Sequence, residues 1–289
     1  MRGSLPLRRA LLSLLACLPL LGFVPARAAE EMALDRWPQS RADDVASLQL
    51  GARLFVNYCL NCHSAVMMRW NRLREIGIDE AKIKEELIFG DQRVGDTMTV
   101  AMNARDAKNW FGKAPPDLSV IIRARNTAEH LGTDYVYTLL RSFYRDRTTL
   151  TGWNNLVYPN IAMPHPLWQR QGPRATTIER VEREEGGEGK AQSHWMRVTS
   201  HFAPDGALRV EKAPQDGGPE SFSVRFEPAD KAQAAAYDED VADLVAYLNW
   251  MGEPGAATRY RVGVWVVGFL IIFSLVARWL SRVYWKDVR

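Results

Sequence analysis

The segment of this chain that most constrains its fold is Cys59-Leu60-Asn61-Cys62-His63. In a C-x-x-C-H pattern, each of the two thiols can form a thioether with one vinyl group of a haem, and the adjacent imidazole can bind the iron as an axial ligand. The motif therefore predicts one covalently bound haem c, attached through Cys59 and Cys62 and ligated by His63.

The same motif could be a chance pair of cysteines, a redox dithiol or half of a zinc site. A zinc site needs further ligands at suitable spacing, and the remaining cysteine, Cys17, lies in a segment that we expect to be removed. With both cysteines of the mature chain bound to haem, no disulfide can form, so the haem must supply much of the core. We therefore expect the apo-protein to be poorly folded.

Residues 1–28 have the order of a secretory signal. Basic residues are followed by an apolar run over residues 10–24 and by the small-residue pattern Ala26-Arg27-Ala28. This order predicts a signal peptide that is cleaved after Ala28. Acylation of Cys17, as in a lipoprotein, is the alternative, but the apolar run continues past that residue. Because haem of this kind is attached outside the cytoplasm in bacteria, the signal and the haem motif support each other.

Residues 259–281 are predicted to form a transmembrane helix. No charged side chain occurs over residues 262–277, and with Arg261 and Arg278 directed towards the headgroups the segment has the roughly 20 residues that cross about 30 Å of hydrocarbon. A buried core helix is the alternative, but such a helix rarely ends a chain with a basic, aromatic tail like residues 282–289. The signal then predicts a single span in the bacterial inner (plasma) membrane, with residues 29–258 in the periplasm and the tail in the cytoplasm.

The haem motif is predicted to lie at the end of an amphipathic helix that Asp43 or Asp44 can cap. Apolar residues recur at three- and four-residue steps and form one face, made of Val45, Leu48, Ala52, Phe55 and Cys59. Such a periodicity is typical of a helix with one buried side.

Two further helices are predicted by the same periodicity. One starts at about Asp134 with Thr133 as a possible cap, and its apolar positions are Val136, Leu139, Leu140 and Phe143. The other starts at Asp238 or Asp240, ends at Gly252, and has the apolar positions Val241, Leu244, Val245, Leu248 and Met251. The fold class is therefore mainly α, a cytochrome c-like haem domain whose first and last helices resemble the crossing pair of that fold.

Residues of about 168–233 form an insertion of different character before the last helix. Short alternating runs, such as residues 195–198 and 222–226, predict a small antiparallel β-element. A run dense in charge and glycine, residues 179–190, is expected to be a solvated loop.

The second iron ligand is predicted to be Met163. It lies about 100 residues after the haem motif, in the proline-braced segment 159–166, which suits a loop that presents one side chain. A methionine opposite the histidine fills the sixth coordination position of the iron and raises its reduction potential. His165, in the same loop, is the competing ligand, and an open sixth position is the third possibility. The other methionines are read as core filler.

These segments, in this order, resemble the cytochrome c1 family over nearly all of the mature chain. The resemblance is carried by residues 51–64, Ala114-Pro115-Pro116-Asp117-Leu118-Ser119, Ile122-Arg123-Ala124-Arg125 followed by Asp134-Tyr135-Val136, Ile161-Ala162-Met163-Pro164, and the closing helix with its single anchor. Many unrelated carriers share the haem motif alone. The Pro-Pro-Asp-Leu segment followed by Arg-Ala-Arg is much more specific.

The resemblance implies that His63 and Met163 are the axial ligands and that residues 115–116 shape a wall of the haem pocket. It also implies that Arg123 hydrogen-bonds a haem propionate, with Arg125 as the alternative partner. A forked, permanently charged donor suits a partly buried carboxylate. The inserted residues 168–233 depart from the family pattern, and they could contact another subunit or nothing.

The function that the resemblance implies is a one-electron relay. Members are the haem c subunits of the cytochrome bc1 complex (ubiquinol:cytochrome c reductase), which takes part in respiratory electron transport. The expected partners are the cytochrome b subunit, the Rieske iron-sulfur protein as electron donor, a soluble cytochrome c as acceptor, membrane lipid and a second copy of the complex. Quinol oxidation and proton release belong to the complex, so the chain itself needs no catalytic residue and acts as a carrier.

Two other functions compete with this one. A free-standing, membrane-anchored carrier that serves another oxidase or reductase would have the same fold and ligands. An enzyme that binds a ligand at the iron, such as a peroxidase or a gas sensor, would need a vacant sixth position, and Met163 argues against it. Nucleic acid is not an expected partner, because the net charge of +3 includes the basic signal and tail.

Overall fold

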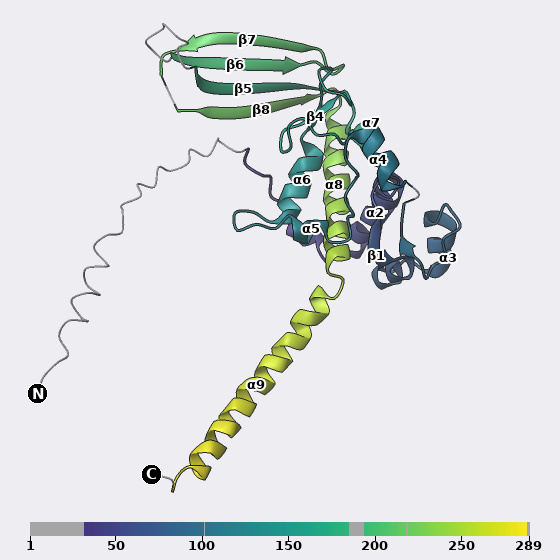
Figure 1. The fold of residues 1–289 in the computed structure, drawn as a ribbon, viewed down its shortest axis with the longest axis vertical. Coiled ribbons are helices and arrows are strands. Elements are labelled where there is room, and N and C mark those ends of the chain that lie inside the picture. The colour runs from purple at the N-terminus through teal and green to yellow at the C-terminus, as the bar shows by residue number, and fades with distance from the viewer. Residues whose placement is uncertain (1–31, 101, 185–193, 218, 288–289) are drawn as a thin grey trace, which may run out of the picture. The chain divides into compact units, whose positions relative to one another are not determined.

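The computed structural model describes residues 32–100, 102–184, 194–217 and 219–287 (Figure 1). The predicted signal peptide, residues 1–28, lies outside the described residues. The helical elements are η2 (Gln39–Arg41), α2 (Val45–Leu54), η3 (Phe55–Cys59), η4 (Trp70–Ile76), α3 (Glu80–Lys82), η5 (Ile83–Leu87), α4 (Ala104–Phe111), α5 (Ile121–Ala124), α6 (Gly132–Arg141), α7 (Trp168–Gln171), α8 (Lys231–Gly252) and α9 (Ala256–Tyr284). The strands are β1 (Ala65–Arg69), β2 (Thr97–Met98), β3 (Phe143–Arg145), β4 (Trp153–Asn155), β5 (Arg174–Glu184), β6 (His194–Phe202), β7 (Leu208–Gln215) and β8 (Ser221–Pro228).

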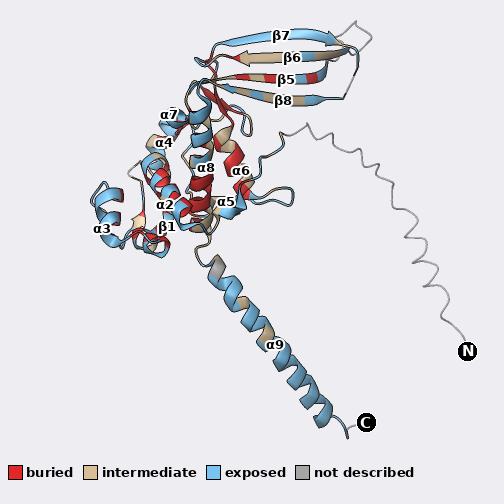
Figure 2. Ribbon diagram, turned by 180° about the vertical axis from the view of Figure 1, so that it is seen from behind, coloured by how far each residue is buried: buried red, intermediate tan, exposed pale blue. Residues whose placement is uncertain are grey.

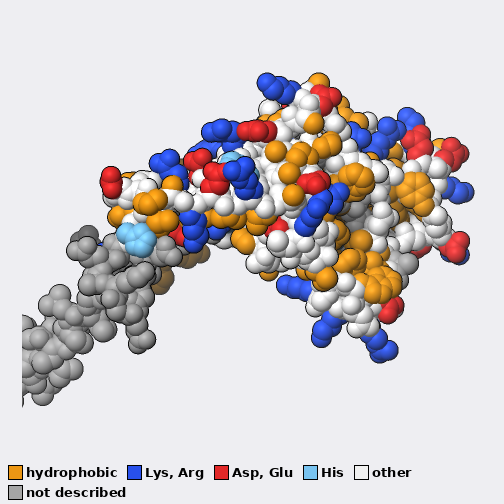
Figure 3. Space-filling model, turned by 90° about the horizontal axis from the view of Figure 1, so that it is seen from above, with side chains coloured by type: hydrophobic (Ala, Val, Ile, Leu, Met, Phe, Trp, Pro, Cys, Tyr) orange, Lys and Arg blue, Asp and Glu red, His pale blue; other side chains and the backbone are white. Residues whose placement is uncertain are grey.

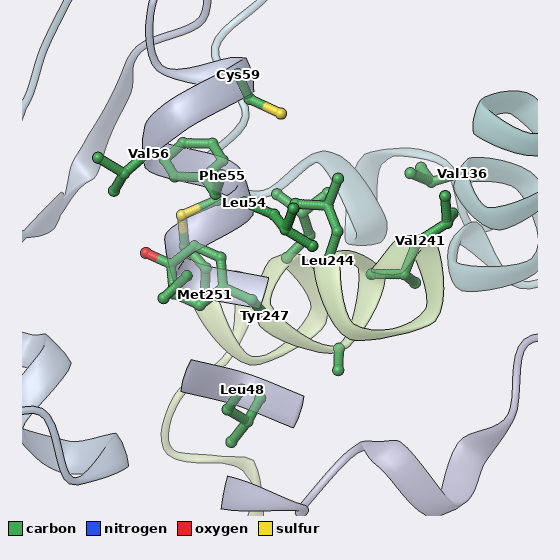
Figure 4. Close-up of a cluster of buried hydrophobic side chains, with 14 of the residues drawn as sticks. Leu48, Leu54, Phe55, Val56, Cys59, Val136, Val241, Leu244, Tyr247 and Met251 are labelled. Atoms are coloured by element: carbon green, nitrogen blue, oxygen red, sulfur yellow. The ribbon is translucent and has the colours of Figure 1, made fainter. Parts of the chain in front are cut away.

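The core of the helical part lies where α2 and η3 pack against α8. The predicted cap is confirmed, since the Asp44 carboxylate accepts from the backbone N–H groups of Ala46 and Ser47, each at 3.3 Å. The predicted apolar face is buried except for Val45, whose side chain is exposed because it occupies the first turn of the helix. Figure 4 shows this face against α8, and the rings of Phe55 and Tyr247 lie 5.5 Å apart.

Helix α8 starts earlier than the sequence analysis predicted. It begins at Lys231, where the Asp230 carboxylate accepts from the N–H of Ala232 at 2.8 Å, so the predicted start at Asp238 or Asp240 was wrong. Residues 231–237 include four alanines, which favour helix without adding a large apolar side chain to the periodic pattern. The predicted apolar positions of this helix are all buried (Figure 2).

Helix α6 also starts earlier than predicted, at Gly132. Thr133 lies inside the helix and does not cap it. The free N–H of Gly132 instead donates to the side chain of Asn126 at 2.7 Å, so a residue from the preceding loop does the work of a cap. Phe143, predicted on the helix, is fully buried in the short strand β3 that follows.

The insertion forms a four-stranded antiparallel sheet in the order β7-β6-β5-β8, which confirms the predicted β-element. The charged run 179–190 was expected to be a loop, but its residues 179–184 continue β5, and residues 185–190 lie outside the described residues. In the ladder Ile178 pairs with Val224, and Thr176 pairs with Phe202, so alternate residues give the sheet one largely apolar face. Tyr144 from β3 packs on this face, with ring centroids of Tyr144 and Phe202 4.7 Å apart.

Charged side chains of both signs are interspersed on the face seen in Figure 3. Ion pairs among the described residues include Arg141 with Asp238 at 2.7 Å and Arg209 with Glu211 at 2.8 Å. Exposed pairs of this kind contribute at most about 1 kcal/mol each. The stability of the fold therefore depends mainly on the apolar contacts between the helices.

Helix α9 is exposed along its length in the chain taken alone. Residues 258–284 are long and apolar enough to cross a membrane, in agreement with the anchor predicted over residues 259–281. An apolar helix that stays exposed among the described residues is the kind of helix that lipid can surround.

The crossing of α2 and α8 predicts a strong effect of a methyl group at Gly51. A Cβ there would lie 2.0 Å from the carbonyl oxygen of Asp243 and 2.7 Å from the Cβ of Tyr247, so Gly51→Ala must push the helices apart. We expect a loss of about 1–3 kcal/mol in the free energy of unfolding, measured by denaturant unfolding of the haem-loaded chain in detergent. Gly95→Ala is the control, because nothing lies within 4 Å of the added atom. Equal stability of the two variants would contradict this packing.

Candidate haem site

The haem motif lies where η3 runs into a tight turn. The backbone N–H groups of Cys62 and His63 both donate to the carbonyl oxygen of Cys59, at 3.1 and 2.8 Å. The N–H of Leu60 donates to the carbonyl of Phe55 at 2.9 Å, which is the wider spacing of a π-helix, an irregularity that is frequent at functional sites. Because Phe55 is fully buried, the core fixes the backbone that carries the two thiols and the imidazole.

The surroundings of the two cysteines do not favour thiolates. Burial, together with the neighbouring Cys62, raises the pKa of the Cys59 thiol to about 12, and burial also raises the pKa of Cys62. Redox dithiols and zinc ligands need thiolates, which electropositive surroundings stabilise. These two cysteines therefore fit uncharged thioether attachment better than a dithiol or a zinc site.

The imidazole of His63 is held by one nitrogen. Its Nδ1 lies 2.7 Å from the carbonyl oxygen of Pro116, and since a carbonyl can only accept, Nδ1 carries the proton. Burial lowers the pKa of His63, so the ring is neutral at neutral pH and Nε2 keeps its lone pair. A histidine that donates its other N–H to a backbone carbonyl is the usual form of a metal ligand.

The segment 115–119 lies along the haem motif and ties it to the rest of the domain. The N–H of Leu118 donates to the carbonyl of Ser64 at 2.8 Å, directly after the histidine. The side chains of Asp117 and Ser119 accept from backbone N–H groups of β1. The sequence analysis expected a wall here but missed these two side chains, and the one signal for them was a carboxylate directly after two prolines.

Met163 lies on the loop where the sequence analysis expected a ligand. It and Ile161 are partly buried and pack against the apolar cluster that contains Cys59. The loop turns at Asn160, which has a positive φ of 58° and whose N–H donates to the side chain of Asn154 at 2.8 Å. A turn fixed in this way holds the thioether of Met163 near the core that the haem motif borders.

His165, the competing ligand, is enclosed by aromatic rings. Its ring stacks on Phe143 with centroids 4.6 Å apart, and the edges of Trp153 and Tyr237 meet it at 5.0 and 6.0 Å. Burial, with the charge of Arg174, lowers the pKa of His165 to about 3. Neither ring nitrogen has a hydrogen-bond partner among the described residues. This packing engages the imidazole in the core, which favours Met163 as the ligand.

Arg123 and Arg125, the two candidates for a propionate, have different surroundings. Arg123 lies on α5, and its side chain is 59% exposed and 3.8 Å from the Glu253 carboxylate. The Arg125 guanidinium lies over the ring of Tyr135, 5.0 Å from its centroid. In these contacts Arg123 is paired with a carboxylate and Arg125 is not. The guanidinium of Arg123 is also exposed enough to bind a haem propionate.

The side chains around the motif fit a haem. Two uncharged thiols could form thioethers with the haem vinyl groups, and one oriented neutral imidazole and one methionine thioether could ligate the iron. Several apolar side chains pack against the core cluster that contains Cys59 but stay partly exposed, among them Tyr58, Leu60, Leu118, Ile121, Tyr135 and Ile161. Within the described ranges, no group of three or more His, Cys, Asp or Glu side chains could hold a bare metal ion.

The sequence matches the Cytochrome C1 family over residues 39–176 and 219–288. The unmatched residues 177–218 include most of β5 and all of β6 and β7, so the match excludes most of the inserted sheet and includes every haem-site residue discussed above.

Named relatives agree with this match over most of their length. The chain is 38% identical to "Cytochrome c1" of Allochromatium vinosum, covering 85% of this chain and 86% of the relative. It is 38% identical to a protein of Nitrosomonas europaea named "Ammonia monooxygenase gamma subunit", covering 95% and 97%. It is 27% identical to "Cytochrome c1, heme protein, mitochondrial" of Schizosaccharomyces pombe, covering 88% and 72%. The family match over most of the chain, joined to the geometry of the motif, shows that the chain belongs to the cytochrome c1 family.

Proposed function

We propose that the chain is the one-electron carrier subunit of a cytochrome bc1 complex. It receives electrons from the Rieske iron-sulfur protein and passes them to a soluble cytochrome c while the complex oxidises quinol. The observation that carries this proposal is the orientation of His63, whose Nδ1 is engaged by the Pro116 carbonyl and whose Nε2 is left for iron. The family match supports the assignment to a bc1 complex.

The side chains of the site have separate tasks. The bound haem supplies a one-electron couple. Cys59 and Cys62 would hold it by covalent bonds, and His63 and Met163 would ligate the iron in both oxidation states. Arg123 donates to a propionate. No side chain of this chain has to move a proton.

The candidate span and the predicted signal support an arrangement of the chain in the membrane. Helix α9 holds the chain in the membrane beside the cytochrome b subunit, the haem domain lies in the periplasm, and residues 282–289 lie in the cytoplasm. The relevant enzyme is the whole ubiquinol:cytochrome c reductase, working as a dimer in the bacterial inner membrane. The interspersed charges of the surface (Figure 3) would make docking of the soluble acceptor depend on salt.

The assembly is tested by affinity purification of the C-terminally tagged chain from mildly solubilised membranes, with reduced-minus-oxidised spectra of the eluate. We expect b-type haem bands and a Rieske subunit in constant proportion to the c-type band. A c-type band that elutes alone would overturn the proposal in favour of a free-standing carrier. Elution with another enzyme complex instead would likewise overturn it, and the name of the Nitrosomonas relative makes an ammonia monooxygenase one assembly to look for.

The sixth ligand is tested with carbon monoxide, which binds reduced haem iron only where a position is vacant or labile. We expect no binding to the native chain and ready binding to Met163→Leu, because leucine has no donor atom. Met196→Leu makes the same chemical change on β6 of the inserted sheet and is the matched control. His165→Phe keeps an aromatic ring against Phe143 and is expected not to bind carbon monoxide. Binding by His165→Phe, and none by Met163→Leu, would make His165 the ligand.

A further inference from the structure

We propose that Asp117 is a positioning residue for the axial ligand His63, because its carboxylate fixes the direction of the Pro116 carbonyl. One oxygen, Oδ2, accepts from the backbone N–H of Val66 at 2.9 Å. The other, Oδ1, accepts from the N–H of Ser119 at 2.9 Å. The proposal rests on the haem site proposed above and adds a residue to which no role has yet been given there.

The backbone of residues 115–117 explains why a side chain is needed to aim this carbonyl. Proline fixes φ of residues 115 and 116, but it leaves ψ of Pro116 free. The peptide plane between Pro116 and Asp117, which contains the acceptor oxygen, can therefore rotate. Binding the Asp117 side chain on both sides stops that rotation, and the carbonyl stays 2.7 Å from Nδ1 of His63.

The contacts of Asp117 belong to a set that joins two segments of the chain. On one side of it, the N–H of Leu118 donates to the carbonyl of Ser64 at 2.8 Å. On the other side, the N–H of Met67 donates to the hydroxyl of Ser119 at 3.0 Å, and this serine is buried. The residues that follow His63 are thus bound to residues 117–119 at several successive positions. A shift of Asp117 would be passed directly to the histidine.

An amide could not replace this carboxylate. Both oxygens of Asp117 accept, whereas asparagine has one accepting oxygen and presents N–H groups at the other position. Asp117→Asn would therefore set a donor against one of the two backbone N–H groups. Asp117→Asn also removes a negative charge next to the residue whose carbonyl holds the imidazole. Loss of the charge and loss of the orientation act in the same direction on the iron.

The test is the reduction potential of Asp117→Asn in the haem-loaded full-length chain. Without the anion, and with a weaker hydrogen bond from Nδ1, His63 donates less electron density, so the reduced form is favoured. We expect a rise equivalent to roughly a three- to tenfold change in the redox equilibrium constant, where tenfold is about 59 mV for one electron. The matched control is Asp79→Asn, because the Asp79 carboxylate also accepts a backbone N–H, that of Lys82 at 2.8 Å, at the start of α3.

A second readout reports the ligand itself. In the Met163→Leu background the reduced iron has His63 as its axial protein ligand, and the iron–histidine stretching frequency in resonance Raman spectra follows the strength of the hydrogen bond from Nδ1. We expect Asp117→Asn to lower this frequency and Asp79→Asn to leave it unchanged. A merely structural role of Asp117 would lower stability without moving either the potential or the frequency.

The outcomes separate this proposal from the proposed function. An unchanged potential and an unchanged frequency in Asp117→Asn would overturn the positioning role, whatever complex the chain joins. Shifts in both would support it even if the purified chain carried no b-type haem or Rieske subunit. If Asp117→Asn takes up no haem, Asp117→Ser is measured instead, since its hydroxyl can keep the bond to Ser119 while losing the one to Val66. A smaller shift in the same direction is then expected, and none would contradict the proposal.

Discussion

The hydrogen bond from His63 to the carbonyl of Pro116 is the interaction on which the rest of the site depends. It decides which ring nitrogen carries the proton and leaves the other for iron. It also joins two segments that lie 53 residues apart, the haem motif and the proline-rich loop. Without it the imidazole could rotate about its own side-chain bonds, and the iron would have a ligand of variable strength.

The packing of the helical core fixes the backbone next to this hydrogen bond. The close approach at Gly51 brings α2 and η3 onto α8, and Phe55 is completely buried just before the motif. The backbone of the haem motif is therefore held at its start by the buried Phe55 and at its end by the hydrogen bond of His63 to Pro116. Most of the inserted sheet lies outside the family match. Its recorded contacts with the helical part include the packing of Tyr144 on the sheet, the hydrogen bond from Arg174 to the Arg141 carbonyl at 2.7 Å, and that from the Arg147 N–H to the Gly206 carbonyl at 3.2 Å.

The sequence predicted those features of the fold that depend on interactions between residues close together in the chain. Asp44 caps α2 as expected because its carboxylate reaches N–H groups two and three residues away. The start of α8 was wrong, since alanines extend a helix without marking a face, and the start of α6 was wrong because a loop residue, Asn126, replaces the cap. The sheet was predicted from its alternation, whereas its strand order comes from pairings that no single segment contains.

The donors of the site were predicted for the same reason, and their supports were not. C-x-x-C-H is a local pattern, and the loop around Met163 has a local composition that stands out. The contacts that support this choice of donors join segments far apart in sequence: the Pro116 carbonyl meets the imidazole of His63, and the rings of Phe143 and Tyr237 enclose the competing His165. Such pairings depend on the folded core, so periodicity and spacing could not reveal them.

The proposed site requires that His63 and Met163 both ligate the iron of one covalently bound haem. X-ray absorption at the iron edge of the native, full-length chain tests it most directly, because it counts the atoms around the metal by type. Histidine and methionine ligation predicts one sulfur and five nitrogens, four of them from the ring, in both oxidation states. Six nitrogens with no sulfur, or a position that is empty in the reduced protein, would contradict it.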